Sequence, residues 1–252
     1  MTSTDRFAHD WESQGYLTRL DILTGAEVQA YRSRFDELES NEGKSKAEIG
    51  LIDRHFDTKF VWELATHGTI LNHVQRTIGP DVLLLATHFF CKYPSRGDKF
   101  VAWHQDVTYW GLEPPFAITA WLAIDDADQE NGCMRVIPGS QLGEILDHGK
   151  SCKAGNLLSI NQEIADSAVN AESAVDIVLK AGQMSLHHGK LIHGSNPNRS
   201  NRRRCGLTLR FVPPTVKQVK SNSTGGGWNP VLVCGEDRYH HFELRPRPSF
   251  NL

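Results

Sequence analysis

Apolar residues recur every three or four positions in the segment that follows Leu23. The members of this series are Val28, Tyr31, Phe35 and Leu38. Thr24 and Glu27, at its start, have the spacing of a capping box, in which each side chain accepts a hydrogen bond from the other residue's backbone N–H. The pattern predicts an amphipathic helix that packs its apolar face on a core.

A second helical pattern runs through residues 67–78, and Gly79 and Pro80 end it. Between the two predicted helices, the polar stretch at 41–46 contains Gly43 and predicts a loop. The helical signals therefore come early in the chain.

From Asp81 onward the pattern changes to short runs of branched and aromatic residues. The run VLLLATHFFCKY, bounded by Gly-Pro on one side and Pro94 on the other, predicts a buried strand. Further runs that predict strands are residues 116–124, 133–137, 175–179, 183–187 and 205–212. Turn-forming clusters such as ENG, PGS, KAGQ and SNPNRSN separate them.

Helices first and many short strands later predict a mainly β, jelly-roll-like core with helical cover. The chain has no clear linker, internal repeat or low-complexity tract. We therefore expect a single domain over 1–252, with a helical N-terminal part at about 1–80 and a β core at about 81–252. The Ser-, Asn- and Gly-rich stretch at 217–228 predicts a mobile loop.

Composition limits the partners and the location. The formal net charge of −3 gives no reason to expect nucleic acid or an anionic membrane as a partner, so we expect a small-molecule substrate. The five cysteines form no C-x-x-C pair, and the N-terminus lacks the apolar core of a signal peptide. A reducing, cytoplasmic location fits these features best.

The candidate chemistry begins with WHQDVTYWG, where His104 and Asp106 are two residues apart. On an extended strand this spacing projects both side chains to one face, so the two residues can share a metal. A second histidine would complete the set of two histidines and one carboxylate that suits iron(II) and leaves coordination positions open. His193 is the preferred candidate, while His187 and His188 are the alternatives, more simply explained as ordinary strand residues beside the site.

Three sequence blocks and the N-terminal segment resemble the phytanoyl-CoA dioxygenase superfamily of Fe(II)/2-oxoglutarate-dependent oxygenases. The blocks are WHQD at 103–106, AWLAIDDADQENGCMRVIPGS at 120–140 and HGSNPNRSNRRRCGLTLRFVP at 193–213, and the N-terminal segment is FAHDWESQGYLTRLDILTGAEV. The resemblance covers most of the chain. It implies a double-stranded β-helix, the cupin-like form of the jelly roll, that encloses Fe(II) held by His104, Asp106 and His193, with 2-oxoglutarate and O2 as co-substrates.

The resemblance also implies residues that bind the co-substrate. Arg204 lies eleven residues after His193 and would meet the far carboxylate of 2-oxoglutarate, to which a guanidinium fork is well matched. Ser195 would add a hydroxyl, and Trp121 stands where relatives carry an aromatic near the co-substrate, although a core tryptophan is an equally good interpretation. Arg210 is six positions after Arg204, so on an extended strand both side chains point to the same face. Arg210 is therefore the second candidate for the anchor, or a contact to an anionic substrate.

The sequence says less about the arginines next to Arg204 and about the residues that contact the substrate. We expect Arg202 and Arg203 to form a solvated basic turn. The candidate substrate contacts are His88, Lys92, Tyr109, Trp110 and Arg210. Lys92 is equally well explained as a surface residue, and Tyr109 and Trp110 as packing under a loop.

The expected reaction is hydroxylation of an aliphatic C–H bond of a small, polar metabolite, with release of succinate and CO2. Desaturation or ring closure by the same site is the alternative, and a non-catalytic metal-binding jelly-roll protein is the rival from another class. Asp106 argues against halogenation, because its carboxylate fills the position that a halide would need. No motif identifies the substrate or the oligomeric state.

Overall fold

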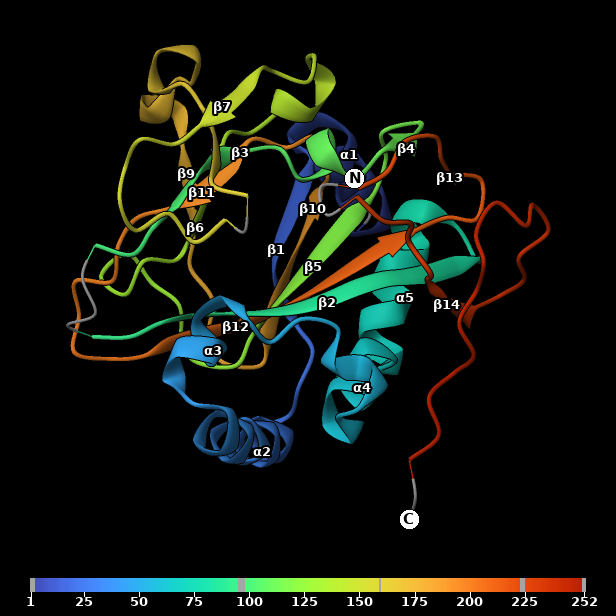
Figure 1. Ribbon diagram of the computed structural model, residues 1–252, viewed down its shortest axis with the longest axis horizontal. Coiled ribbons are helices and arrows are strands. Elements are labelled where there is room, and N and C mark those ends of the chain that lie inside the picture. Colours follow the sequence, from blue (N-terminus) through green and yellow to red (C-terminus); the bar gives the residue numbers. More distant parts are fainter. Residues whose placement is uncertain (1–2, 95–97, 159, 223–224, 251–252) are drawn as a thin grey trace.

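The computed structural model describes residues 3–94, 98–158, 160–222 and 225–250. Two antiparallel sheets form the core (Figure 1). The larger sheet has the order β1 (Tyr16–Asp21), β10 (Gln183–His188), β5 (Ile118–Ala123), β12 (Arg204–Val212), β2 (Val82–Lys92) and β14 (Val231–Cys234). The smaller sheet has the order β3 (Val101–His104), β11 (His193–Ser195), β6 (Met134–Val136) and β9 (Val175–Ile177). This is the predicted mainly β, jelly-roll architecture.

Helices and short pairs of strands complete the fold. The helices are α1 (Ser3–Gln14), α2 (Gly25–Glu42), α3 (Lys44–Ile49), α4 (Lys59–Ala65) and α5 (Gly68–Ile78). The short 3-10 helices are η1 (Arg54–Phe56), η2 (Asp106–Tyr109), η3 (Ser140–Leu142), η4 (Asp166–Ala168) and η5 (Ala171–Ser173). Two small pairs join β4 (Leu112–Glu113) to β13 (Lys217–Gln218) and β7 (His148–Lys150) to β8 (Gln162–Ile164).

The larger sheet has two faces of different chemistry, which follow from the alternation of side chains along each strand. Cys205, Leu207, Leu209 and Phe211 of β12 belong to the main hydrophobic cluster, together with buried side chains of α2, α4 and α5. The intervening residues Arg204, Thr208 and Arg210 line a cavity on the other face. Burial of the apolar face against the helices thus fixes which face is turned toward the smaller sheet.

The helical predictions are confirmed at both main helices. At the start of α2 the backbone N–H of Thr24 donates to Glu27 at 2.8 Å, and that of Glu27 donates to Thr24 Oγ1 at 3.3 Å. Helix α5 begins after His67 and ends at Gly79, whose φ of 94° lies in the left-handed region that favours glycine. The six strand predictions are also confirmed, with ends that differ by up to two residues.

The predicted loop at 41–46 is wrong. Helix α2 continues to Glu42 and α3 begins at Lys44, so Gly43 alone separates them, with a φ of 86°. Lys46 and Glu42 form an ion pair across this junction. One glycine at positive φ is therefore enough to change the chain direction without a loop.

The prediction of a solvated basic turn holds for Arg202 and is wrong for Arg203. Arg202 is partly exposed and pairs with Asp128. The side chain of Arg203 is only 18% exposed; it lies between Asp125 and acidic residues of α2, Asp36 and Glu39, within 3.2 Å of each. Its burial comes from residues of a helix far away in sequence, and it joins that helix to the β core.

The described part of the predicted mobile loop at 217–228 is tied to the core at its two ends. Lys217 and Gln218 pair with β4, and the indole N–H of Trp228 donates to the carbonyl of Trp110 at 2.9 Å. Residues 223–224 lie outside the described residues.

The five cysteines are all free thiols. Among the described residues, no helix has the length and apolar character needed to cross a membrane. The cytoplasmic location and the single-domain organisation stay predictions.

Candidate active site

His104, Asp106 and His193 come together at one point between the sheets. His193 opens β11 and pairs in register with His104, the last residue of β3. One ligand atom from each of the three side chains lies within 4.8 Å of the others, and all three residues are buried at this point. Among the described residues this is the one group of three or more candidate ligands found at such short range.

The expectation that one strand carries both His104 and Asp106 is only partly right. Strand β3 ends at His104, and Asp106 opens the 3-10 helix η2. Gln105 between them keeps an extended backbone, with φ −120° and ψ 126°, so the two flanking side chains still share a side. The Gln105 side chain is held elsewhere, because its Nε2 donates to the carbonyl of Lys190 at 2.8 Å.

Each histidine ring is oriented by the backbone carbonyl of the residue two positions before it. Nδ1 of His104 lies 2.9 Å from the carbonyl of Ala102, and Nδ1 of His193 lies 2.9 Å from the carbonyl of Leu191. These contacts place the proton on Nδ1 and leave the Nε2 lone pair for a cation, as is usual for histidine ligands. Burial, together with the neighbouring histidines, holds the pKa of His193 well below its ordinary value, so its ring is neutral and able to bind a metal.

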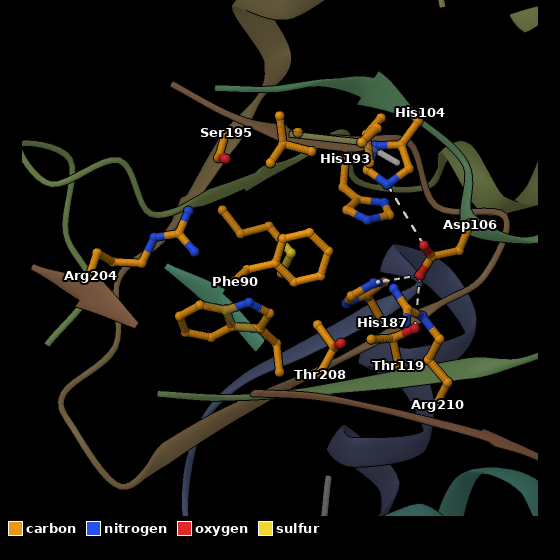
Figure 2. A pocket seen from close by; sticks show the side chains of 15 residues that line it. Phe90, His104, Asp106, Thr119, His187, His193, Ser195, Arg204, Thr208 and Arg210 are labelled. Carbon is orange, nitrogen blue, oxygen red and sulfur yellow. Dashed lines mark hydrogen bonds and ion pairs between the residues drawn. The ribbon is translucent and has the colours of Figure 1, made fainter. Parts of the chain in front are cut away.

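The carboxylate of Asp106 is held from two sides. Its Oδ1 lies 3.7 Å from Nε2 of His104, while its Oδ2 accepts a hydrogen bond from Thr119 at 2.8 Å and lies 3.4 Å from Nε2 of His187 (Figure 2). Burial raises the pKa of Asp106, but the neighbouring imidazoles, His187 among them, and the charge of Arg210 hold the pKa well below its usual range. Asp106 is therefore a carboxylate with fixed orientation.

The two alternative histidines have other surroundings. His187 lines the same cavity, with its ring 4.5 Å from that of His193, and it contacts Asp106 instead of joining the group of three. His188 points away, because its ring packs against Phe116 and Trp11. The geometry favours His193 as the second histidine.

Thr119→Val tests how Asp106 is held. The substitution keeps the side-chain shape but removes the hydroxyl donor to Oδ2, so we expect the affinity for iron(II) to fall by about 10- to 100-fold. An equilibrium titration with iron(II) measures it. Thr208→Val is the matched control, since that hydroxyl lines the same cavity but donates to the carbonyl of His88. Equal affinities in wild type and Thr119→Val would contradict the role of this hydrogen bond.

The three candidate ligands lie in the wall of a cavity with about 490 Å³ of free space, part of it open to solvent. The remaining lining residues are Phe90, Val101, Thr119, Trp121, Met134, Leu158, His187, Gly194, Ser195, Arg204, Thr208 and Arg210. Ser195, Trp121, Arg204 and Arg210, all identified in the sequence, therefore share one cavity with the triad.

Arg204 lies on the Ser195 side of the cavity, away from Asp106 (Figure 2). It is 3% exposed, its guanidinium carbon is 5.4 Å from the centre of the Trp121 ring, and its Nε has no hydrogen-bond partner. Gly206, two residues along β12, leaves room for that ring, because a Cβ there would lie 2.0 Å from it. The space beside Arg204 is thus shaped by an indole and a glycine.

Lys92 is not a surface residue, and it does not line the cavity. It is the cross-strand partner of Arg204, is 1% exposed, and donates to Ser195 Oγ at 2.6 Å and to the carbonyl of Asn196. Burial, with the charge of Arg204 in addition, holds the pKa of Lys92 well below its ordinary value. Lys92 positions Ser195.

Lys92 contacts a hydroxyl and a carbonyl, the Nε of Arg204 has no partner, and neither side chain forms an ion pair within the described residues. The buried guanidinium of Arg204 is costly unless an anion meets it. A dicarboxylate that reaches from the triad to Arg204 would complete this charge arrangement. The residues present therefore fit iron(II) at His104, Asp106 and His193, and 2-oxoglutarate at Arg204 and Ser195.

The other predicted substrate contacts, His88, Tyr109 and Trp110, do not line the cavity. His88 is covered by the segment after α3, where Ile52 bridges to it and the carbonyl of Ile49 meets its Nε2. Burial, together with the charge of Arg210, lowers the pKa of His88 to about 3.

Tyr109 and Trp110 make contacts outside the cavity lining, although the Trp110 ring lies 5.3 Å from the guanidinium carbon of Arg210. The hydroxyl of Tyr109 donates to the carbonyl of His148 at 3.1 Å, and Trp110 is buried against Trp228. These contacts fit the interpretation that Tyr109 and Trp110 pack under a loop.

Sequence reasoning missed six residues of the lining, namely Val101, Thr119, Met134, Leu158, Gly194 and Thr208. For the two threonines a signal was present, because Thr119 has the strand parity of Trp121, and Thr208 that of Arg204 and Arg210. Leu158 comes from an irregular segment and carries no such signal.

Two buried imidazoles and a carboxylate at one point of a jelly roll, facing a buried arginine across one cavity, define a class: mononuclear non-haem iron oxygenases that use 2-oxoglutarate. The sequence model of the family "Phytanoyl-CoA dioxygenase (PhyH)" matches residues 11–206. The chain belongs to this family.

Known relatives agree with this assignment. The peroxisomal phytanoyl-CoA dioxygenase of Bos taurus is 25% identical over 236 residues, which cover 85% of this chain and 70% of the relative. The solved structure of ThoJ, described as a non-haem monooxygenase, is 27% identical and superposes with a TM-score of 0.76 over 96% of this chain and 88% of its own.

A second solved structure shares the fold. The epimerase SnoN, solved with Fe3+, alpha-ketoglutarate and nogalamycin RO, is 22% identical and has a TM-score of 0.72 over 86% of each chain. The protein is a 2-oxoglutarate-dependent non-haem iron oxygenase that requires Fe(II), 2-oxoglutarate and O2.

Proposed function

We propose that this protein hydroxylates an aliphatic C–H bond of a small, polar metabolite. One O2 and one 2-oxoglutarate are consumed for each C–H bond converted to C–OH, and succinate and CO2 are released. In this proposal His104, Asp106 and His193 hold iron(II). The observation that carries it is a single cavity with the buried triad on one side and the uncompensated cation Arg204 on the other.

The bound iron and 2-oxoglutarate supply the oxidation of the C–H bond when O2 is present. The chain's own residues bind and orient the reactants. Arg204 presents a guanidinium fork to the far carboxylate of 2-oxoglutarate, and Ser195, held by Lys92, adds a hydroxyl. Trp121 forms the wall beside this carboxylate.

The other residues of the cavity wall favour a small substrate that carries polar groups. Phe90, Val101 and Met134 give the cavity apolar walls that exclude water from the reacting bond, while Thr208 and Arg210 give it polar ones. Asp106 occupies the ligand position that a halide would need, which favours hydroxylation over halogenation.

The test is incubation of the protein with iron(II), ascorbate and 2-oxoglutarate under air, with succinate as the readout. We expect slow succinate formation that a true substrate accelerates, and a product that carries one oxygen atom from ¹⁸O2. Desaturation or ring closure would give a product without the label. Absence of succinate, together with absence of a metal-to-ligand charge-transfer band with 2-oxoglutarate, would contradict the proposal.

A further inference from the structure

Arg210 lies at the opposite end of the cavity from Arg204. Both residues belong to β12 and line the cavity, but they are six positions apart, which is about 20 Å along a strand. Figure 2 shows Arg210 on the side of Asp106, Thr119 and His187, and Arg204 on the side of Ser195. One arginine therefore lies beside the metal ligands and the other lies away from them.

Arg210 has no polar partner among the residues that the structure describes. It forms no ion pair or hydrogen bond there, and its Nε is buried and unsatisfied. Its guanidinium carbon lies 5.3 Å from the centre of the Trp110 ring. Arg203, in contrast, meets three carboxylates. An unsatisfied guanidinium in a cavity wall is costly unless a ligand meets it.

The charged groups around Arg210 do not neutralise it by contact. The charge of Arg210 lowers the pKa values of Asp106, Asp53 and His88, yet neither carboxylate forms an ion pair with it. Asp106 is committed to the metal, and Thr119 and His187 occupy its second oxygen. With 2-oxoglutarate extended from the metal to Arg204, Arg210 still lacks a counterion.

Arg210 is also part of a row of polar side chains across three neighbouring strands. In the register of the larger sheet, Arg210 of β12 faces Thr119 of β5, and Thr119 faces His187 of β10. All three residues line the cavity, and Nδ1 of His187 is buried without a hydrogen-bond partner. The row thus offers a ligand one cation and one further unsatisfied nitrogen, both next to Asp106.

We propose that Arg210 binds an anionic group of the primary substrate, so that the substrate carries a carboxylate or a phosphorus oxyanion. This inference rests on the proposed function. Arg210 fixes the substrate by that group beside the triad, while Arg204 keeps 2-oxoglutarate at the other end. Two separate arginines prevent the two anions from competing for one site.

The test uses the whole protein loaded with iron(II) and 2-oxoglutarate without oxygen, and follows the charge-transfer band. The probes are short linear carboxylates, alkylphosphonates of the same chain lengths, and the corresponding primary amides. We expect members of one anionic series to shift the band and, under air, to accelerate succinate formation, while the neutral amides do neither. Comparing the two anionic series identifies the oxyanion.

Arg210→Gln should raise the concentration of the effective anion needed for half-maximal response by roughly 10- to 100-fold. Arg210→Lys should restore part of that response, because it keeps the charge but loses the fork. The 2-oxoglutarate concentration needed for the band should change far less. Arg202→Gln, a partly exposed arginine outside the cavity, is the matched control and should respond like wild type.

Four results would overturn the inference. They are amides as effective as anions, no anion that shifts the band, an unchanged response in Arg210→Gln, and a greater need for 2-oxoglutarate in Arg210→Gln than in Arg204 variants. An anion that abolishes the band has displaced 2-oxoglutarate and also counts against it. Failure of the proposed function looks different, because wild type then shows no band with 2-oxoglutarate in the absence of any probe.

Discussion

Asp106→Ala is expected to abolish 2-oxoglutarate turnover. The substitution removes the only carboxylate among the three candidate ligands and leaves two neutral imidazoles, so charge neutralisation at the metal is lost as well as one bond. Loss of a residue that merely supports a ligand costs about 10- to 100-fold in affinity or activity, and loss of the ligand itself should cost more. Iron(II) titration and succinate formation measure the two effects separately.

His188→Gln is the control for a change near the site. His188 is adjacent to His187 on β10, but its ring packs against Phe116 and Trp11, away from the cavity. We expect this variant to bind iron(II) like wild type. Turnover at the wild-type rate in Asp106→Ala would rule out the ligand set of His104, Asp106 and His193.

Elements with strong local signals could be predicted from the sequence. The capping box at Thr24 and Glu27 is a local hydrogen-bond arrangement, and β2 is a dense run of branched and aromatic residues between breakers. The junction at Gly43 could not be predicted as a sharp turn, because loop and tight turn share the same composition. The positive φ angle of Gly43 and the ion pair of Lys46 with Glu42 produce the tight turn.

Residues whose environment comes from distant segments were harder to interpret. Arg203 is buried because Asp36 and Glu39 of α2 lie over the end of β12, a contact that no local pattern encodes. Lys92 is buried because the register of β2 with β12 places it beside Arg204, where its ammonium reaches the hydroxyl of Ser195. His88 has the right strand parity but is covered by the segment after α3.

The alternation of side chains along a strand made part of the candidate site predictable from the sequence. Parity groups Arg204 with Arg210, and His104 with Asp106, without any knowledge of the fold. The pairing of His104 with His193 depends on the register of β3 with β11, which only the folded chain provides. The same holds for the row of Arg210, Thr119 and His187, whose members lie on three strands far apart in sequence.

Arg204→Ala is expected to raise the KM for 2-oxoglutarate by about 100-fold or more, with a smaller effect on kcat. Arg204 is buried, its Nε lacks a partner, and its cross-strand neighbour Lys92 is committed to Ser195 and the carbonyl of Asn196. Lys92 therefore cannot replace the lost fork. Arg204→Lys should recover only part of the affinity, because an ammonium offers a point charge where the guanidinium offers two parallel donors.

Succinate formation as a function of 2-oxoglutarate concentration separates KM from kcat in these variants. Arg202→Ala is the control, because Arg202 is partly exposed, pairs with Asp128 at the surface and should leave the KM unchanged. A rise in the KM for 2-oxoglutarate in Arg210→Gln, with none in Arg204→Ala, would move the anchor to Arg210. The two arginines of β12 would then exchange roles, and Arg204 would become the candidate contact for the substrate.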